Sequence, residues 1–514
     1  MTKHQKFQRG IPAGITHLVG MGLALMIWAG FPGEARAHIG SPNAIFEGLA
    51  GNIPVRVIVR PPGVVPGLAD IDVRVFTNGV RKVTVLPVHW RAGVAGSPPP
   101  DECLPVVGDP ELFHAQLWLM ARGAYSVNVH VETERGSGKV IVPVNSLATT
   151  RLAMPKGLGT VLGALGVFLF LLAVSAVGAA VRESVLDPGM EVSRRRVWLG
   201  RLGVVVAMLV IGLGLWGGSV WWGAVDGDYR NHQMYRPVTA RAETRLDSGA
   251  RVLSLYVDAT NSGSTAWSPL VPDHGKLMHM FLVREPGMDV FAHLHPVRRA
   301  SRHFDVVLPA LPAGTYRAYA DVTHESGFSQ TLTTAVEIPA AGPTGEGPAD
   351  LPADPEDSWS SGGVATNGVA SLGDGLTMKL AVDEPLRAGR GVTLRVQVRE
   401  ASGAAAKLEP YISMLAHAAI RRDDGTVFTH LHPAGSISMA SQQVFQIRSG
   451  EKGARRVTPE LLEQLCAPPG PDALLQPVAF PYEFPKPGHY RVWVQVKSGG
   501  AVHTGVFDLE VAAK

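Results

Sequence analysis

Cysteine is almost absent from this sequence, because the 514 residues include only two, Cys103 and Cys466. Neither belongs to a C-x-x-C or C-x-x-C-H motif, so thioredoxin-like redox chemistry and c-type haem attachment have no support. A long-range disulfide in an oxidising compartment and two unpaired structural thiols are both compatible with this pair.

An excess of charge of one sign is missing too. The 47 Lys and Arg residues nearly balance the 44 Asp and Glu residues, which leaves a formal net charge of +3 and no basic block. Nucleic-acid-binding proteins usually carry clustered positive charge, so we expect no nucleic-acid partner. Walker, dinucleotide-binding, Gly-x-Ser-x-Gly and His-Glu-x-x-His motifs are absent as well, and with them the commonest signatures of enzymes.

Glycine and proline, by contrast, are abundant, with 58 and 39 residues, and the runs between them are short and rich in valine. Runs such as VRVIVR at 55–60 alternate apolar and polar residues, which is typical of strands with one buried face. We predict a mainly β protein with three Ig-like β-sandwich domains, at residues 38–150, 228–340 and 364–514. The Pro-, Gly- and acid-rich linker at 341–363 should be disordered.

The first 37 residues have the features of a secretory signal peptide. A basic start precedes the apolar stretch GMGLALMIWAGF, and Ala35-Arg36-Ala37 fits the small-x-small cleavage pattern. Cleavage there would make His38 the mature N-terminus. An uncleaved N-terminal anchor is the alternative.

Two long apolar runs, 160–181 and 202–222, predict a pair of transmembrane helices. The loop between them, 182–201, carries five arginines, and positive charge in a short loop favours the cytoplasmic side. All three sandwiches would then be extracytoplasmic, in the periplasm of a bacterium or outside the cell, anchored in the inner (cytoplasmic) membrane. Neither run has an ionisable residue near its centre, so we do not expect the chain alone to be a transporter.

One histidine-containing pattern occurs twice, at 274–296 and at 411–433. Each copy has a histidine on an apolar run, a turn with glycine, and a second run carrying Phe-x-His-x-His before a proline. Folded as hairpins around 286–288 and Asp424-Gly425, the copies place His279 opposite His295 and His417 opposite His432. Because side chains alternate along a strand, each hairpin should gather three imidazoles on one face. They are His279, His293 and His295 in the first copy and His417, His430 and His432 in the second.

Three neutral imidazoles suit copper or zinc, whereas Mg²⁺ and Ca²⁺ prefer oxygen ligands. We favour copper, with zinc as the alternative. The alternative is that the histidines are structural residues that the duplication copied. Met278 and Met280 alternate with His279 and should face the core instead. His274 and His324 are candidates to supplement the first site, and His503 to supplement the second.

The predicted N-terminus suggests a further site. A free amine and imidazole on His38 would chelate Cu(II), with His114 or His130 from the sandwich as the additional ligand. Such an end resembles the histidine brace of CopC-type copper carriers and copper monooxygenases. The competing interpretation is that His38 merely follows a cleavage site.

The whole layout resembles bacterial membrane-anchored β-sandwich proteins of the FixH and YtkA-like kind, which implies copper handling. Our leading hypothesis is a periplasmic metal-binding protein that delivers, buffers or senses copper or zinc, with an envelope protein or metal transporter as partner. The alternative is a non-enzymatic envelope scaffold with structural histidines. A third hypothesis, a metal-dependent oxidoreductase, is less favoured because the hairpins place no carboxylate beside the histidines as a general base. The sequence leaves the oligomeric state open.

Overall fold

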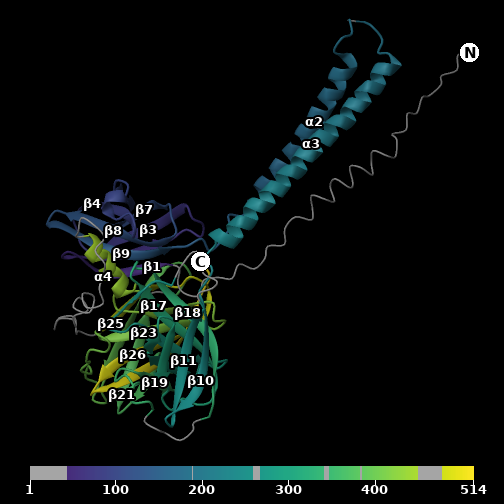
Figure 1. Ribbon diagram of the computed structural model, residues 1–514. Helices are drawn as coiled ribbons and strands as arrows, with labels where there is room; N and C mark the ends of the chain where they lie inside the picture. The colour runs from purple at the N-terminus through teal and green to yellow at the C-terminus, as the bar shows by residue number, and fades with distance from the viewer. Residues whose placement is uncertain (1–42, 188, 259–266, 341–346, 383–384, 450–476) are drawn as a thin grey trace, which may run out of the picture. The chain divides into compact units, whose positions relative to one another are not determined.

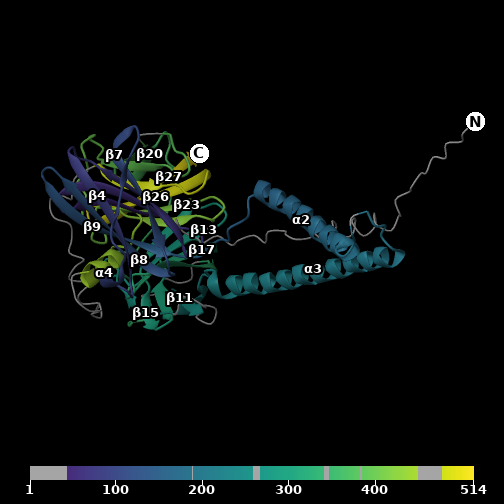
Figure 2. The same cartoon turned by 90° about the horizontal axis from the view of Figure 1, so that it is seen from above.

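The computed structural model describes residues 43–187, 189–258, 267–340, 347–382, 385–449 and 477–514 (Figures 1 and 2). These residues belong to one compact unit, His38–Lys514. The predicted signal peptide at 1–37, His38 and Cys466 lie outside the described residues. The prediction of a mainly β chain with several antiparallel sheets and two long apolar helices is confirmed.

Two antiparallel sheets form the N-terminal sandwich. Alternate residues of β2, Val55, Val57 and Val59, are fully buried and share one core with Val127 and Val129 of β8. The first sheet has the order β1 (Ala44–Ala50), β2 (Ile53–Arg60), β3 (Gly67–Val75), β7 (Asp109–Leu119), β6 (Leu104–Val106). The second has the order β5 (Asp101–Glu102), β4 (Val80–His89), β8 (Gly123–Thr133), β9 (Gly136–Ser146), with a 3-10 helix, η1 (Val94–Gly96), after β4. Cys103 is buried in this core.

Two apolar helices follow, α2 (Lys156–Glu183) and α3 (Arg194–Asp228), and both are long and apolar enough to cross a membrane. They extend beyond the predicted spans, and the connection is shorter than predicted because α3 begins at Arg194, where the Ser193 side chain accepts a hydrogen bond from the Arg196 amide. The helices pack closely at Gly178, where an added Cβ would lie 2.6 Å from Val204. A short π-helix, η2 (Tyr229–Gln233), ends α3.

The second sandwich contains the first histidine hairpin. Its core combines Leu253 and Leu255 of one sheet with Met280 and Leu282 of the other. One sheet has the order β10 (Thr239–Asp247), β11 (Ala250–Asp258), β16 (His303–Val307), β15 (Val297–Ala300). The other has the order β12 (Leu270–Val271), β17 (Gly314–His324), β13 (His279–Arg284), β14 (Val290–Leu294), β19 (Ser358–Ser361), and β18 (Ser329–Ile338) also pairs with β17.

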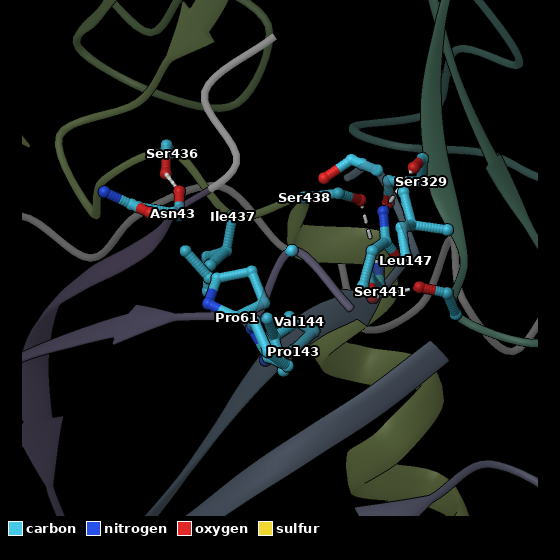
Figure 3. Close-up of a pocket in the computed structure, with 16 residues that line it drawn as sticks. Asn43, Pro61, Pro143, Val144, Leu147, Ser329, Ser436, Ile437, Ser438 and Ser441 are labelled. Atoms are coloured by element: carbon cyan, nitrogen blue, oxygen red, sulfur yellow. Dashed lines mark hydrogen bonds between the residues drawn. The ribbon is translucent and has the colours of Figure 1, made fainter. Parts of the chain in front are cut away.

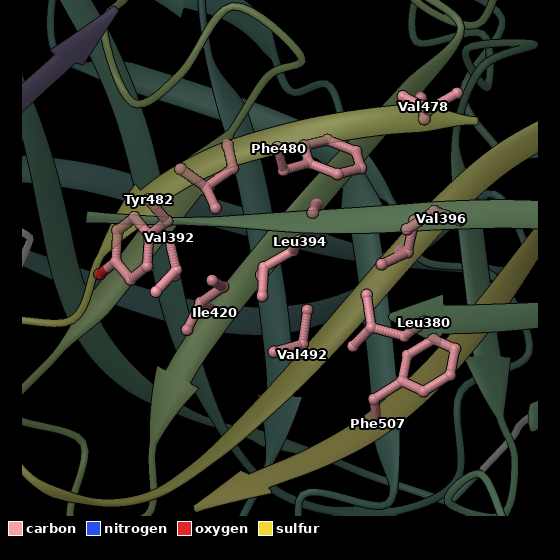
Figure 4. Close-up of a cluster of buried hydrophobic side chains, with 14 of the residues drawn as sticks. Leu380, Val392, Leu394, Val396, Ile420, Val478, Phe480, Tyr482, Val492 and Phe507 are labelled. Carbon is pink, nitrogen blue, oxygen red and sulfur yellow. The ribbon is translucent and has the colours of Figure 1, made fainter. Parts of the chain in front are cut away.

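The third sandwich repeats this plan around the second hairpin. Figure 4 shows its core, in which Leu394 and Val396 of one sheet meet Ile420 and Val492 of the other. The sheets have the orders β20 (Val369–Gly373), β21 (Leu376–Val382), β22 (Gly391–Arg399), β25 (Val478–Glu483) and β24 (Phe428–Leu431), β23 (Ala416–Arg422), β26 (Gly488–Ser498), β27 (Ala501–Val511).

The prediction that the linker at 341–363 is disordered is wrong for its described part, because that part belongs to the second sandwich. Strand β19 pairs with β14, and Leu351 is buried. Two acidic residues just before β19 form ion pairs with Lys276, whose Nζ lies 2.5 Å from Asp354 Oδ2 and 3.1 Å from Glu356 Oε2. The segment therefore gains a strand ladder and ion pairs that its composition does not reveal.

A helix between the second hairpin and β25, α4 (Met439–Ser449), joins the N-terminal and second sandwiches. The Gln442 amide donates to the Ile141 carbonyl at 2.7 Å. The Arg448 guanidinium donates to the Trp90 and Glu325 carbonyls, each at 3.0 Å. These side-chain bonds hold the loop after the second hairpin against both sandwiches.

An ion pair whose acid is buried, and whose arginine is 28% exposed, joins the N-terminal and third sandwiches and generates the first prediction. Arg60 Nη2 lies 2.5 Å from Glu483, whose side chain is 1% exposed. We expect Arg60→Ala to destabilise the full-length protein by about 3–5 kcal/mol, because removing one partner leaves a buried charge uncompensated. Thermal unfolding of the detergent-solubilised chain measures this. Arg74→Ala is the control, because the Arg74–Asp109 pair is about one-third exposed and should contribute about 1 kcal/mol or less. Equal shifts for both variants would contradict the prediction.

Candidate metal centre

The hairpin registers match those counted from the turns. In the first hairpin Met280 pairs with Leu294, and continuing this register places His279 opposite His295. In the second hairpin Ala418 pairs with Leu431, which likewise places His417 opposite His432. The difference in turn length therefore leaves the alignment of the histidines intact, as predicted.

Each hairpin brings its three imidazoles together. One nitrogen from each of His279, His293 and His295, the first triplet, lies within 4.8 Å of the others, and the same holds for His417, His430 and His432, the second triplet. In both triplets the Nδ1 of the first histidine lies 3.1 Å from the Nε2 of the second. The histidine groups that the sequence predicted are thus present, and whether they bind metal stays a prediction.

The outer nitrogens of the first triplet all face oxygen acceptors. His279 Nε2 lies 3.1 Å from the Asp273 carbonyl, His293 Nδ1 lies 3.0 Å from Gln495 Oε1, and His295 Nδ1 lies 2.9 Å from Asp357 Oδ1. A neutral imidazole has one N–H donor and one lone pair. Because a carbonyl and a carboxylate oxygen only accept, His279 and His295 donate outward, which leaves lone pairs on His279 Nδ1 and His295 Nε2. The tautomer of His293 that donates to Gln495 Oε1 has its lone pair on Nε2.

The second triplet repeats this arrangement with different partners. His417 Nε2 donates to the Tyr411 carbonyl at 3.1 Å, and His432 Nδ1 donates to the Ile437 carbonyl at 3.3 Å. His430 Nδ1 lies 3.6 Å from Asp321, beyond hydrogen-bond distance, so this contact does not fix the tautomer of His430. Its Nε2 lies 3.1 Å from His417 Nδ1, as in the first triplet. Among the described residues, His295 Nε2 and His432 Nε2 have no hydrogen-bond partner.

Two imidazole nitrogens 3.1 Å apart either share an N–H, donated by one neutral ring to the other, or hold a cation between two lone pairs. The doubly protonated, cationic ring is disfavoured here, because burial lowers the pKa of His279, His293, His417 and His430 well below 6.5, and neighbouring imidazoles lower it further. Burial lowers the pKa of His432 to about 4. Neutral imidazoles with oriented outer N–H groups are the form in which histidine ligates metals. The donor set therefore fits a metal cation.

The two triplets form one six-histidine cluster, which the sequence reasoning missed. Phe281 and Phe291 of the second sandwich pack with Phe428 and Trp493 of the third, so the two hairpin sheets face each other. Ring centroids of His279 and His430 lie 5.3 Å apart, and those of His293 and His430 lie 5.6 Å apart. A signal was present, because β13 and β14 are continuous apolar runs, typical of strands buried on both faces.

Several other residues at the cluster were also missed or misplaced. Asp357 and Asp354, from the segment predicted to be disordered, form with His295 a third group whose ligand atoms lie within 4.8 Å of one another. Gln495 reaches His293 from β26. His274, expected at the first site, instead contacts the second triplet, with ring centroids 5.0 Å from His432 and 5.7 Å from His417.

Two adjoining cavities lead away from the cluster. The first, of about 160 Å³, is lined by His279, His430 and His432 together with Asp273 and Asp321. Burial raises the pKa of Asp321 to about 7. The second, of about 280 Å³, lies beside Pro61 and Pro143 of the N-terminal sandwich (Figure 3). Both cavities are lined by Asn145, Ser329, Ser436, Ile437 and Ser438, so polar side chains line the space between the sandwiches.

The remaining predicted ligands lie elsewhere. His114 and His130 are on different sheets of the N-terminal sandwich and alternate with buried residues, so they point outward from opposite sides and at most one of them could join His38. His38 lies outside the described residues, so the predicted N-terminal site stays a prediction. His503 is bonded to the Leu372 carbonyl and His324 to Ser268, so neither supplements a triplet. Met278 and Met280 are buried in the core of the second sandwich, as predicted.

The lowered histidine pKa values predict a pH-dependent stability of the metal-free protein. In the unfolded chain the imidazoles titrate near 6.5, whereas in the folded chain they stay neutral to lower pH. The unfolded state therefore binds more protons below that value, so stability is full above about pH 6.5 and falls as the pH decreases. Thermal midpoints with a chelator should drop between about pH 7 and about pH 5. The fall of the midpoint with pH should be smaller in a His293→Gln, His430→Gln double variant. An equal fall in that variant would show that the buried histidines do not cause it.

Comparisons with known proteins show limited likeness. A domain of unknown function, DUF8832, matches residues 370–513. No curated protein matches the chain. Among solved structures, latent PorU from Porphyromonas gingivalis is 8% identical with a TM-score of 0.14, covering 92% of this chain and 34% of PorU. A putative membrane anchored protein from Corynebacterium diphtheriae is 8% identical with a TM-score of 0.15, covering 92% and 96%. Likeness at these scores carries no argument about function.

Proposed function

We propose that this protein is a membrane-anchored metal-binding protein that holds copper or zinc at the six-histidine cluster. One observation carries the proposal. In both triplets one nitrogen from each of the three rings lies within 4.8 Å of the other two, and the Nδ1 of the first histidine lies 3.1 Å from the Nε2 of the second. A structural role alone requires imidazoles to be bonded, but it does not require three of them to gather their nitrogens at one point.

The proposed location is the periplasmic side of a bacterial inner membrane. Two helices long and apolar enough to cross a membrane support an anchor. Arg194, Arg195 and Arg196 at the start of α3 favour a cytoplasmic position for the connection between the helices. The sandwiches before and after the helices would then share the outer side.

The donor chemistry supports copper or zinc over hard ions. Imidazole nitrogen suits both metals, whereas Mg²⁺ and Ca²⁺ require oxygen-rich sites. Met278 and Met280 face the sandwich core, so the cluster gains no thioether from them to favour Cu(I). We propose delivery, buffering or sensing of the metal, with an envelope protein or metal transporter as partner.

A scaffold function with structural histidines is the second candidate, and the interface between the sandwiches favours it. Phe291 stacks on Trp493 with centroids 4.9 Å apart, and Tyr319 stacks on Phe428 at 3.9 Å. The Arg421 guanidinium also donates to Glu285 at 2.6 Å. These contacts would hold the two sandwiches together without metal, so the candidates differ in whether metal binds the folded state.

Metal analysis of single variants tests the site directly. The full-length protein should retain two equivalents of Zn²⁺ or Cu²⁺ after gel filtration, and His295→Ala should lose one of them. Asp357→Asn should weaken the same equivalent by about 10- to 100-fold, because Asp357 orients the His295 ring. The matched control is Asp350→Asn, an exposed acid in the same segment. Parent protein that retains no metal would refute the proposal.

Thermal unfolding separates metal binding from the scaffold function. A metal that binds only the folded state stabilises it by about 2.7 kcal/mol when free metal is 100 times its Kd. Adding Zn²⁺ or Cu²⁺ should therefore raise the unfolding midpoint of the parent, and the rise should vanish in a His279→Ala, His417→Ala double variant. If the protein is a scaffold, adding metal should leave the thermal unfolding midpoint unchanged in both the parent and the double variant.

A further inference from the structure

We propose that His274 completes the second triplet, so that one site has four imidazoles drawn from two domains while the other has three. This inference deepens the proposed function and rests on it. It makes the two metal ions unequal, with one closed site that ties the second and third sandwiches together and one site with a coordination position left open.

The position of His274 carries the inference. Although it belongs to the second sandwich, its ring lies 5.0 Å from that of His432 and 5.7 Å from that of His417, both in the third sandwich. The residue is 8% exposed, and its Nε2 has no hydrogen-bond partner among the described residues. The carboxylate oxygen of Asp273 is 3.7 Å from this nitrogen, beyond hydrogen-bond distance. Burying an imidazole nitrogen without a partner is unfavourable, and a shared cation would supply the partner.

The duplication supplies an internal comparison. His274 lies five residues before His279, and Ile412 lies five residues before His417. Both have a left-handed backbone, with φ of 50° and 48°, so the two loops have the same local turn. The second sandwich therefore offers an imidazole where the third offers an aliphatic side chain. Among the described residues His432 Nε2, like His274 Nε2, has no hydrogen-bond partner, and the centroids of the two rings lie 5.0 Å apart.

The first triplet receives a different residue from across the interface. The Tyr411 hydroxyl lies 3.4 Å from His293 Nδ1, the outer nitrogen of that ring. The hydroxyl donates to the Glu356 carbonyl at 3.1 Å and lies 3.1 Å from Ser358 Oγ, so it already has partners. Burial raises the Tyr411 pKa, which disfavours the phenolate form that binds metals. The first triplet thus keeps three protein ligands.

The two coordination sets imply different behaviour. Four protein ligands close a tetrahedral site, as in structural zinc sites, whereas three leave a position for water or an incoming ligand. The ion at the second triplet should therefore be retained, and the ion at the first triplet should exchange with the surroundings or a partner. Because His274 and the second triplet belong to different sandwiches, the retained ion should also hold those sandwiches in contact.

The test compares His274→Asn and His274→Gly with the parent full-length protein in detergent. Both replacements tolerate a left-handed backbone, so a shared effect reports the lost imidazole. Titration with Zn²⁺ against a competing chelator should show two equivalents of unequal affinity in the parent. In both variants the tighter equivalent should weaken by about 10-fold or more and the weaker one should stay unchanged. His303→Asn, an imidazole bonded to Asp305 away from the cluster, is the matched control.

The outcomes are distinct. Unchanged affinities in both His274 variants would overturn this inference and leave the proposed function standing, whereas a parent that binds no Zn²⁺ would refute the proposed function itself. If the His274 variants fail to fold, a measurement on the parent protein still tests the inference. With one equivalent of Cu²⁺, electron paramagnetic resonance should show coupling to four imidazole nitrogens, and three would overturn the inference.

Discussion

A buried imidazole must satisfy two ring nitrogens, and this requirement governs the contact between the second and third sandwiches. Oxygen acceptors face the outer nitrogens of five of the six triplet histidines within hydrogen-bond distance, and Asp321 lies 3.6 Å from the sixth. The inner nitrogens of each triplet lie close to one another. In a low-dielectric interior such nitrogens need a shared N–H or a cation, and burial disfavours the doubly protonated, cationic ring. This arrangement is what the proposed metal site rests on.

The repeated plan of the second and third sandwiches explains how a single chain builds this cluster. Each hairpin strand has one face toward its own core, where Met280 is fully buried, and one face toward the other copy, where His279 lies. Since both copies place their histidines on the outward face, packing the copies together merges two triplets. The copies have also diverged, because His274 has Ile412 as its counterpart, and Asp357 orients a histidine only in the first triplet.

Much of the fold and half of the site could be predicted from the sequence. Strand alternation gave the β architecture, and the turn positions set the hairpin register, because both depend on neighbouring residues. The contact between the two hairpins could not be predicted from turn positions, because it depends on how the second and third sandwiches pack together. Continuous apolar runs in β13 and β14 did hint that both faces are buried. Alternation placed His114 and His130 on outward faces but could not show that β7 and β8 belong to different sheets. The composition of the segment containing β19 predicted disorder, because composition does not show that β19 pairs with β14.

X-ray absorption at the metal edge, on the full-length protein loaded with two equivalents of Zn²⁺ or Cu²⁺, tests the central claim most directly. The claim is that the converging imidazole lone pairs hold the metal. It predicts a first shell of nitrogen or oxygen with the outer-shell scattering of imidazole rings, and no sulfur. A sulfur neighbour, or a first shell without imidazole scattering, would contradict it.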